Sequence, residues 1–174
     1  QIMTDILTVW EHRGNLDNLK VCYMGDGNNI VNSWLQLATR FSMHFVCCGP
    51  EGYEPDSETV NMVNDSDLSS YELSHDPLSA VKDADIIYTD VWASMGQKEE
   101  AEEREKIFAP FQVNRSLIES TGKDTLFMHC LPAERGREVT DSVMESSNSI
   151  VFDQAENRMH AQNAIMVYLS QIMS

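Results

Sequence analysis

Short apolar runs alternate with segments of helical periodicity along the whole chain, and this alternation limits the possible folds more than any other feature. We expect the apolar runs to form strands at 19–24, 44–47, 71–74, 86–88, 126–128 and 150–152. Helices are predicted at 2–12, 30–38, 57–63, 77–82, 98–108, 113–120, 141–144 and from 154 onward. Strand–helix alternation favours a parallel sheet covered on both faces. We therefore predict an α/β fold: a doubly wound, Rossmann-like, three-layer domain with a mostly parallel sheet over residues 1–174.

The charge balance and the cysteines restrict the partners and the compartment. The 28 acidic and 12 basic residues give a formal net charge of −16, the wrong sign for binding nucleic acid and a favourable one for a cationic ligand. No apolar run is long enough to span a membrane, and no signal peptide opens the chain. Cys22, Cys47 and Cys48 lie in apolar runs and are predicted to be buried free thiols. We expect a cytoplasmic protein without nucleic-acid or membrane partners.

Three polar segments, at 25–29, 90–96 and 129–132, each follow one of the predicted strands. The carboxyl ends of parallel strands meet at one edge of a sheet, where open α/β folds bind their ligands. The last segment ends in Pro132, which stops a strand, and it places an imidazole and a thiol at that edge. The sequence therefore predicts one crevice lined by these three segments.

The segment 25–27 has two possible interpretations. It resembles the start of a dinucleotide-binding fingerprint, but Ile30 stands where that fingerprint has its third glycine. The alternative is a glycine turn that packs a helix against a strand. Asn28 and Asn29 follow at a predicted helix N-terminus, where side-chain amides and free backbone N–H groups can hold a carboxylate.

Asp90 ends an otherwise apolar run, so its carboxylate either caps the next segment or binds a cation. The short segment 94–96 is either a loop that closes over a ligand or a plain connection. The acidic run at 99–105 is interpreted as a solvated helix face.

Cys130 could act as a nucleophile, as a proton acceptor or only as a buried thiol, and its place beside His129 favours a functional role. His129 itself could be a strand-end imidazole whose hydrogen bonds are satisfied. Arg158 lies near the start of the last helix, where the helix dipole disfavours a cation. An anionic ligand would explain it, and so would a salt bridge to Glu156 or Asp153.

Four segments taken together resemble the signature segments of ornithine carbamoyltransferases, in the same order and spacing. They are GDGNN at 25–29, DVWASMGQ at 90–97, HCLP at 129–132 and AENR at 155–158. Gln1 resembles the last residue of the family's His-Pro-x-Gln motif. The resemblance implies transfer of a carbamoyl group from carbamoyl phosphate to the δ-amine of L-ornithine, giving citrulline and phosphate, with no metal or organic cofactor.

The resemblance also implies roles for the residues that would bind ornithine. Asn29 corresponds to the family's ligand for the α-carboxylate, and Asp90 corresponds to the partner of the α-ammonium. Ser94 and Met95 resemble the loop that closes over the amino-acid end of the substrate.

A second group of residues resembles the family's carbamoyl phosphate site. Cys130 resembles the thiol beside the reacting δ-amine, with the Leu131 backbone nearby. Gln1 and Arg158 resemble the groups that hold the carbamoyl moiety, and Arg158 would stabilise the developing oxyanion.

The resemblance places this chain in the C-terminal, ornithine-binding half of a two-domain enzyme, with residues 1–13 as an inter-domain helix. The chain starts inside a predicted helix without a cap, so we expect it to be part of a longer polypeptide whose N-terminal carbamoyl phosphate domain is absent here. The family implies a homotrimer or a multiple of it. Two alternatives stay open: a related carbamoyltransferase with another amine acceptor, such as putrescine or an acylated ornithine, and a non-catalytic module that binds amino acids or nucleotides.

Overall fold

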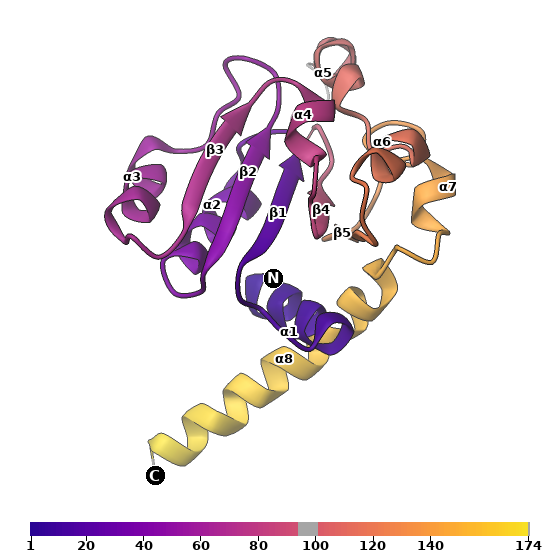
Figure 1. Cartoon of the computed structure of the whole chain (residues 1–174). Coiled ribbons are helices and arrows are strands. Elements are labelled where there is room, and N and C mark those ends of the chain that lie inside the picture. The colour runs from indigo at the N-terminus through magenta and orange to yellow at the C-terminus, as the bar shows by residue number, and fades with distance from the viewer. Residues whose placement is uncertain (94–100, 174) are drawn as a thin grey trace.

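The computed structural model describes residues 1–93 and 101–173, and its centre is a five-stranded sheet (Figure 1). The strands are β1 (Leu19–Met24), β2 (Met43–Cys48), β3 (Ser70–Ser74), β4 (Ile86–Thr89) and β5 (Leu126–His129). They lie in the order β3-β2-β1-β4-β5, and each neighbouring pair is parallel. The chain reverses its direction of travel across the sheet between β1 and β4, as doubly wound folds do. The predicted fold class is confirmed.

Helices cover both faces of the sheet. They are α1 (Ile2–Arg13), α2 (Asn29–Ala38), α3 (Ser57–Asp65), α4 (Pro77–Val81), α5 (Ala101–Phe108), the 3-10 turn η1 (Ala109–Phe111), α6 (Arg115–Ser120), α7 (Asp141–Met144) and α8 (Val151–Ile172). Successive strand residues point to opposite faces, so Val21 and Tyr23 pack with α1 and α2, whereas Cys22 and Met24 pack with α4, α6 and α7. The two apolar layers hold the strand ends in fixed positions.

Several helix ends follow directly from the sequence. Asp56 accepts a hydrogen bond from the backbone N–H of Thr59 at 3.2 Å and begins α3. Asp76 caps α4 in the same way, ahead of Pro77. Gly14 ends α1 with φ 67°, the left-handed conformation that glycine adopts most easily. The residue types at these three positions thus agree with the helix ends that the structure shows.

The predicted strand that starts at Ile150 is wrong, because α8 begins one residue later. Backbone pairing with β5 is reduced to one parallel bridge, between Phe127 and Ser149. The last helix was predicted to start at 154 behind a capping Asp153, but Asp153 lies inside α8 and its carboxylate pairs with His12 of α1 at 2.8 Å. A short apolar run fits a strand and a buried first helical turn equally well, and only its packing distinguishes them.

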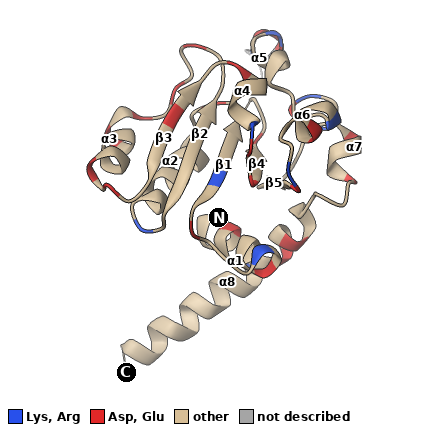
Figure 2. Cartoon of the chain, viewed as in Figure 1, with Lys and Arg blue, Asp and Glu red and all other residues tan. Residues whose placement is uncertain are grey.

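Helix α8 packs on α1 with its first half, and its second half extends away from the rest of the domain (Figure 1). Figure 2 shows that acidic residues are spread over the domain, whereas the extended half of α8 carries no charged residue. The large apolar side chains there, Met166, Tyr168 and Ile172 among them, are exposed. Of the helices that the structure describes, none combines the length and the hydropathy that crossing a bilayer requires.

Candidate functional site

The carboxyl ends of β1, β4 and β5 lie side by side, and the three polar segments start there. The strand register pairs Met24 with Thr89 and Thr89 with His129. The next residues along the chain therefore open three adjacent loops at the position where the direction of the chain reverses. This arrangement brings the predicted segments together wherever the structure describes them.

Asp90 links all three loops through its carboxylate. Its Oδ2 accepts a hydrogen bond from Asn28 Nδ2 at 3.1 Å, and its Oδ1 accepts one from Cys130 Sγ at 3.1 Å. Oδ1 also accepts the N–H of Val91 at 2.8 Å, so Asp90 does cap the following segment, as one interpretation expected. All these donors are neutral, and no cation among the described residues pairs with the half-buried carboxylate. Its negative charge is left for a ligand.

Asn28 connects the end of β1 to α2, whose first residue is Asn29. The Asn28 Oδ1 accepts from the backbone N–H groups of Ile30 and Val31, at 2.9 and 3.4 Å, which leaves its amide nitrogen for Asp90. Asn29, the predicted ligand residue, is exposed, and its side chain makes no hydrogen bond with the described residues. Asn28 is therefore the residue that shapes the site, and Asn29 offers a free amide at its edge.

The turn before Asn28 is shaped by a close approach of two loops. A Cβ at Gly27 would lie 2.3 Å from the backbone nitrogen of Pro55, so only glycine fits there. This contact gives Gly27 a packing role, and that role needs no nucleotide.

The thiol of Cys130 is a hydrogen-bond donor. The side chain is half-buried and donates to the Asp90 carboxylate. Burial raises the pKa of the Cys130 thiol far above its ordinary value, and the charge of Asp90 raises it further. The thiol is therefore protonated at neutral pH, so a thiolate nucleophile or a strong base is disfavoured there.

His129 is fully buried and holds the next turn in place. Its Nδ1 accepts the backbone N–H of Leu131 at 2.8 Å, which puts the ring proton on Nε2. That nitrogen lies 3.3 Å from Oε1 of the equally buried Glu138, although the two atoms are not aligned for a hydrogen bond. Leu131 has φ 55°, a conformation that residues other than glycine rarely adopt. The imidazole therefore fixes an unusual backbone turn directly after Cys130.

The remaining two predicted carbamoyl ligands lie at the start of α1 and on α8. Gln1 is exposed at the start of α1, and its Nε2 donates to Asp5 Oδ1 at 2.7 Å. Arg158 is exposed on α8 and makes no hydrogen bond or ion pair with any residue in 1–93 or 101–173. The alternative of a salt bridge to Glu156 or Asp153 is therefore wrong, because those carboxylates lie beside His160 and His12 instead.

Ser94 and Met95 fall outside the described residues, but the segment that leads to them is anchored by a residue that sequence reasoning missed. Arg104 of α5 is 7% exposed; it donates to the Trp92 carbonyl and to the Asp26 carboxylate. Its guanidinium also lies over the rings of Tyr53 and Phe108. The acidic run was predicted to be a solvated helix face, but Arg104 within it is buried. The only sequence signal for this exception is that Arg104 is the single basic residue of the run.

Among the described residues, the ligand atoms of Asp90, His129 and Cys130 are the one metal-compatible group, lying within 4.8 Å of one another. Each is already engaged in protein contacts: the thiol donates to Asp90, and the two nitrogens of His129 face the Leu131 N–H and Glu138. The arrangement is a network of protein hydrogen bonds, and it positions groups for a polar substrate.

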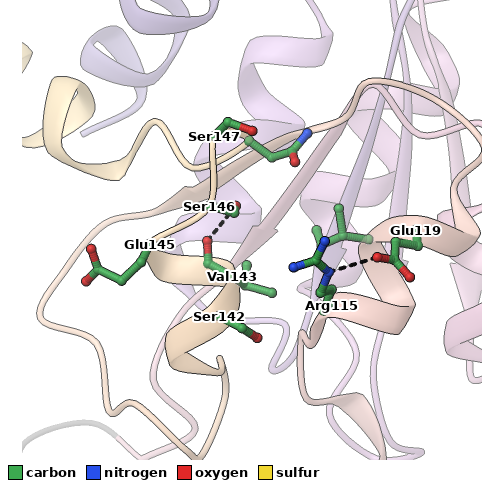
Figure 3. Close-up of a pocket in the computed structure, with 9 residues that line it drawn as sticks. Arg115, Glu119, Ser142, Val143, Glu145, Ser146 and Ser147 are labelled. Carbon is green, nitrogen blue, oxygen red and sulfur yellow. Dashed lines mark hydrogen bonds and ion pairs between the residues drawn. The ribbon is translucent and has the colours of Figure 1, made fainter.

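A hollow of about 420 Å³ lies between α6 and α7, away from these residues (Figure 3). Its mouth carries the Arg115–Glu119 ion pair, whose side chains are largely exposed. None of the polar residues that the structure describes in its lining is buried, so the lining suggests no chemistry.

Comparison with known proteins agrees with this geometry. The family model described as "Aspartate/ornithine carbamoyltransferase, Asp/Orn binding domain" matches residues 17–169. A relative named "Ornithine carbamoyltransferase, chloroplastic", from Pisum sativum, is 58% identical over 169 residues, which cover 97% of this chain and 45% of the relative. An anabolic ornithine carbamoyltransferase from Pyrococcus furiosus is 53% identical, over 95% of this chain and 54% of its own length.

A solved structure of ornithine carbamoyltransferase from Pyrococcus furiosus superimposes on this chain with a TM-score of 0.87 and 54% identity. The match covers 94% of this chain and 53% of that one. The chain thus spans about half the length of the curated relatives it matches.

Proposed function

Since the chain belongs to the aspartate/ornithine carbamoyltransferase family, in which it matches the Asp/Orn binding domain, we propose that it is the ornithine-binding half of an ornithine carbamoyltransferase. The enzyme would transfer the carbamoyl group of carbamoyl phosphate to the δ-amine of L-ornithine and release L-citrulline and phosphate. Family membership confirms the resemblance noted in the sequence. Because the relatives are about twice as long, catalysis is proposed for a protein that also holds the other half.

The observation that carries this proposal is the uncompensated carboxylate of Asp90. It is half-buried at the carboxyl ends of the strands and receives three hydrogen bonds, all from neutral donors. The carboxylate lacks a cationic partner among the described residues, so a ligand ammonium would complete the site. We assign it to the α-ammonium of ornithine.

The N-terminus of α2 supports a place for the α-carboxylate. Asn29 has an exposed side-chain amide there, next to Asn28, whose own amide is bonded to Asp90. Helix N-termini favour anions. An amino acid could therefore bridge Asn29 and Asp90 with its two charged groups, and Ser94 and Met95 are proposed to close over that end.

The δ-amine is placed near Cys130 and the Leu131 backbone. In the reaction, the neutral amine nitrogen forms a bond to the carbonyl carbon of carbamoyl phosphate, the bond from carbon to the bridging phosphate oxygen breaks, and the nitrogen loses a proton. Because the Cys130 thiol is held protonated beside Asp90, we propose that it orients the amine by hydrogen bonding. The departing phosphate takes up the released proton, because its bridging oxygen becomes basic as the bond to carbon breaks.

Gln1 and Arg158 are proposed to hold the carbamoyl phosphate end. The free guanidinium of Arg158 would stabilise the oxyanion that forms when the carbonyl carbon becomes tetrahedral. Carbamoyl phosphate is an anion, and this chain has a net charge of −16, so further cations from the other half of the protein are needed. On the family's precedent we also propose a role in arginine biosynthesis, a cytoplasmic site of action and a homotrimer or a multiple of it.

A chimera tests this function directly. In it, the present chain replaces the matching part of the Pisum sativum relative, and the chimera is assayed with carbamoyl phosphate and four acceptors: L-ornithine, N-acetyl-L-ornithine, putrescine and water. We expect citrulline from L-ornithine, with a kcat/KM that is at least about a hundredfold above that for the other amines. A folded chimera that prefers another amine would support the related-transferase alternative, and one that carbamoylates none would favour a binding module.

A further inference from the structure

Helix α1 contributes a buried carboxyl group that no assigned role explains. Asp5 is 0% exposed, and its Oδ1 accepts two amide hydrogen bonds, both at 2.7 Å. One donor is Nε2 of Gln1 and the other is Nε2 of Gln154 on α8. The second oxygen, Oδ2, has no hydrogen-bond partner among the described residues. An acceptor this poorly satisfied is costly to bury, so its presence calls for a functional reason.

Gln154 extends this contact to the central strand end. It is 1% exposed, and its Oε1 accepts the backbone N–H of His129 at 3.1 Å. Its Nε2 donates to Asp5 and also lies 3.1 Å from the Tyr88 hydroxyl. The Gln154 amide can therefore face only one way, with its oxygen on β5 and its nitrogen on α1. A continuous path of hydrogen bonds runs from Asp5 to the residue just before Cys130.

We propose that Asp5 is a positioning residue for the carbamoyl end of the site, holding Gln1 directly and the His129–Cys130–Leu131 segment through Gln154. This inference rests on the proposed function. Because the Gln1 nitrogen is bonded to Asp5, its Oε1 is the end left to accept an N–H, and the carbamoyl NH₂ supplies one. Asp5 thus selects the amide orientation that recognises carbamoyl phosphate over an acyl phosphate without N–H groups.

A purely structural role explains Asp5 less well. Helices α1 and α8 are already joined by Asn157, which donates to Thr8 and Glu11, and by the His12–Asp153 pair. Burial also raises the pKa of Asp5 to about 6, so its carboxylate destabilises the fold at neutral pH. Asp5 is therefore not needed to hold the two helices together.

The test uses Asp5→Leu, Gln154→Met, the double variant and the control Thr8→Val. Thr8 is buried on α1 at the same helix interface, but its side chain bonds to Asn157 and the Thr4 carbonyl instead of the site. In the chain itself, the rate of Cys130 alkylation reports the position of the thiol, because the other three cysteines are buried. In the chimera, KM for carbamoyl phosphate, KM for L-ornithine and the rate with acetyl phosphate are measured beside the unfolding midpoint.

We expect both single variants to raise KM for carbamoyl phosphate roughly tenfold or more and to reduce the discrimination against acetyl phosphate, with KM for L-ornithine changed by about twofold or less. Alkylation of Cys130 should accelerate in both. Gln154→Met matters because it keeps the Asp5 charge, so a faster reaction there reflects position and not a changed thiol pKa. The double variant should raise KM for carbamoyl phosphate no further than the more strongly affected single variant does, because the two residues act in one path.

The inference would be overturned if Asp5→Leu had the wild-type rate of Cys130 alkylation and the wild-type KM for carbamoyl phosphate. An equally large rise in KM for carbamoyl phosphate in Thr8→Val would also overturn it. So would changes in KM that scale with the drop in unfolding midpoint across the variants. If the unmodified chimera makes no citrulline, the proposed function fails, whereas the alkylation rates in the chain still decide whether Asp5 positions Cys130.

Discussion

Replacing Asp5 by asparagine should change how the stability of the fold depends on pH. Burial is the main cause that raises the pKa of Asp5 from 3.8 to about 6, and the hydrogen bonds from Gln1 and Gln154 oppose it only in part. Between these two values the folded chain still holds a proton that the unfolded chain has lost. The contribution of Asp5 to stability is therefore largest at low pH and disappears as the pH rises through about 6.

The size of the effect follows from the two pKa values. Each pKa unit corresponds to about 1.4 kcal/mol, so the ionised Asp5 carboxylate destabilises the folded state by roughly 3 kcal/mol relative to its protonated form. Between about pH 5 and about pH 7.5 the wild-type chain should lose roughly 1.4 kcal/mol of unfolding free energy through Asp5 alone. Asp5→Asn has no such proton to lose, so its stability relative to wild type should rise by that amount.

Urea unfolding, followed by circular dichroism, measures this difference at several pH values for both proteins. Taking the difference removes the contributions of groups that both chains share. Two titratable groups near Asp5, Tyr88 and Cys130, have strongly raised pKa values and stay neutral throughout this range. The amino group of Gln1, which also acts on Asp5, is present in both proteins. A difference that stays constant with pH, within about 0.5 kcal/mol, would show that Asp5 does not carry a buried charge and would refute the reasoning.

Further predictions concern the site itself. Asp90→Asn in the chimera should weaken L-ornithine binding by about 1.5–3 kcal/mol; an unchanged KM would mean that Asp90 only caps the next segment. Cys130→Ser should lower kcat but keep the pH profile of kcat/KM above neutrality, since the thiol is not ionised there; loss of an alkaline-side ionisation would show that Cys130 is the base. Arg104→Lys should lower the unfolding free energy by about 1–3 kcal/mol and raise KM for L-ornithine, because lysine cannot bond Trp92 and Asp26 together; urea unfolding and kinetics decide. The isolated chain should form no measurable citrulline.

The features that depend on local sequence were predictable. The strand at 19–24 has the predicted bounds. Asp56 and Asp76 begin their helices and Gly14 ends its own, as their residue types indicate. The meeting of Asp90 and Cys130 followed from the parallel sheet, because each lies directly after a neighbouring strand. Topology alone brings such residues together.

The features that depend on long-range packing could not be read from the sequence. The Gln154–Asp5 contact joins residues that are 149 positions apart, and neither residue type suggests complete burial. Arg104 looked like one charge in a solvated acidic run until its contacts with two loops were known. Asn28 and Asn29 are chemically identical, and only the direction of α2 determines that Asn28 faces Asp90.

The central claim, that Asp90 binds the α-ammonium of ornithine, is tested most directly by removing that ammonium from the substrate. 5-Aminopentanoate is ornithine without its α-amino group, so kcat/KM is compared for both compounds in the wild-type and Asp90→Asn chimeras. The account predicts that Asp90→Asn lowers kcat/KM for L-ornithine at least about tenfold and leaves that for 5-aminopentanoate within about twofold. An equal loss for both compounds would contradict the claim, because Asp90 would then act on a part of the substrate that the two share.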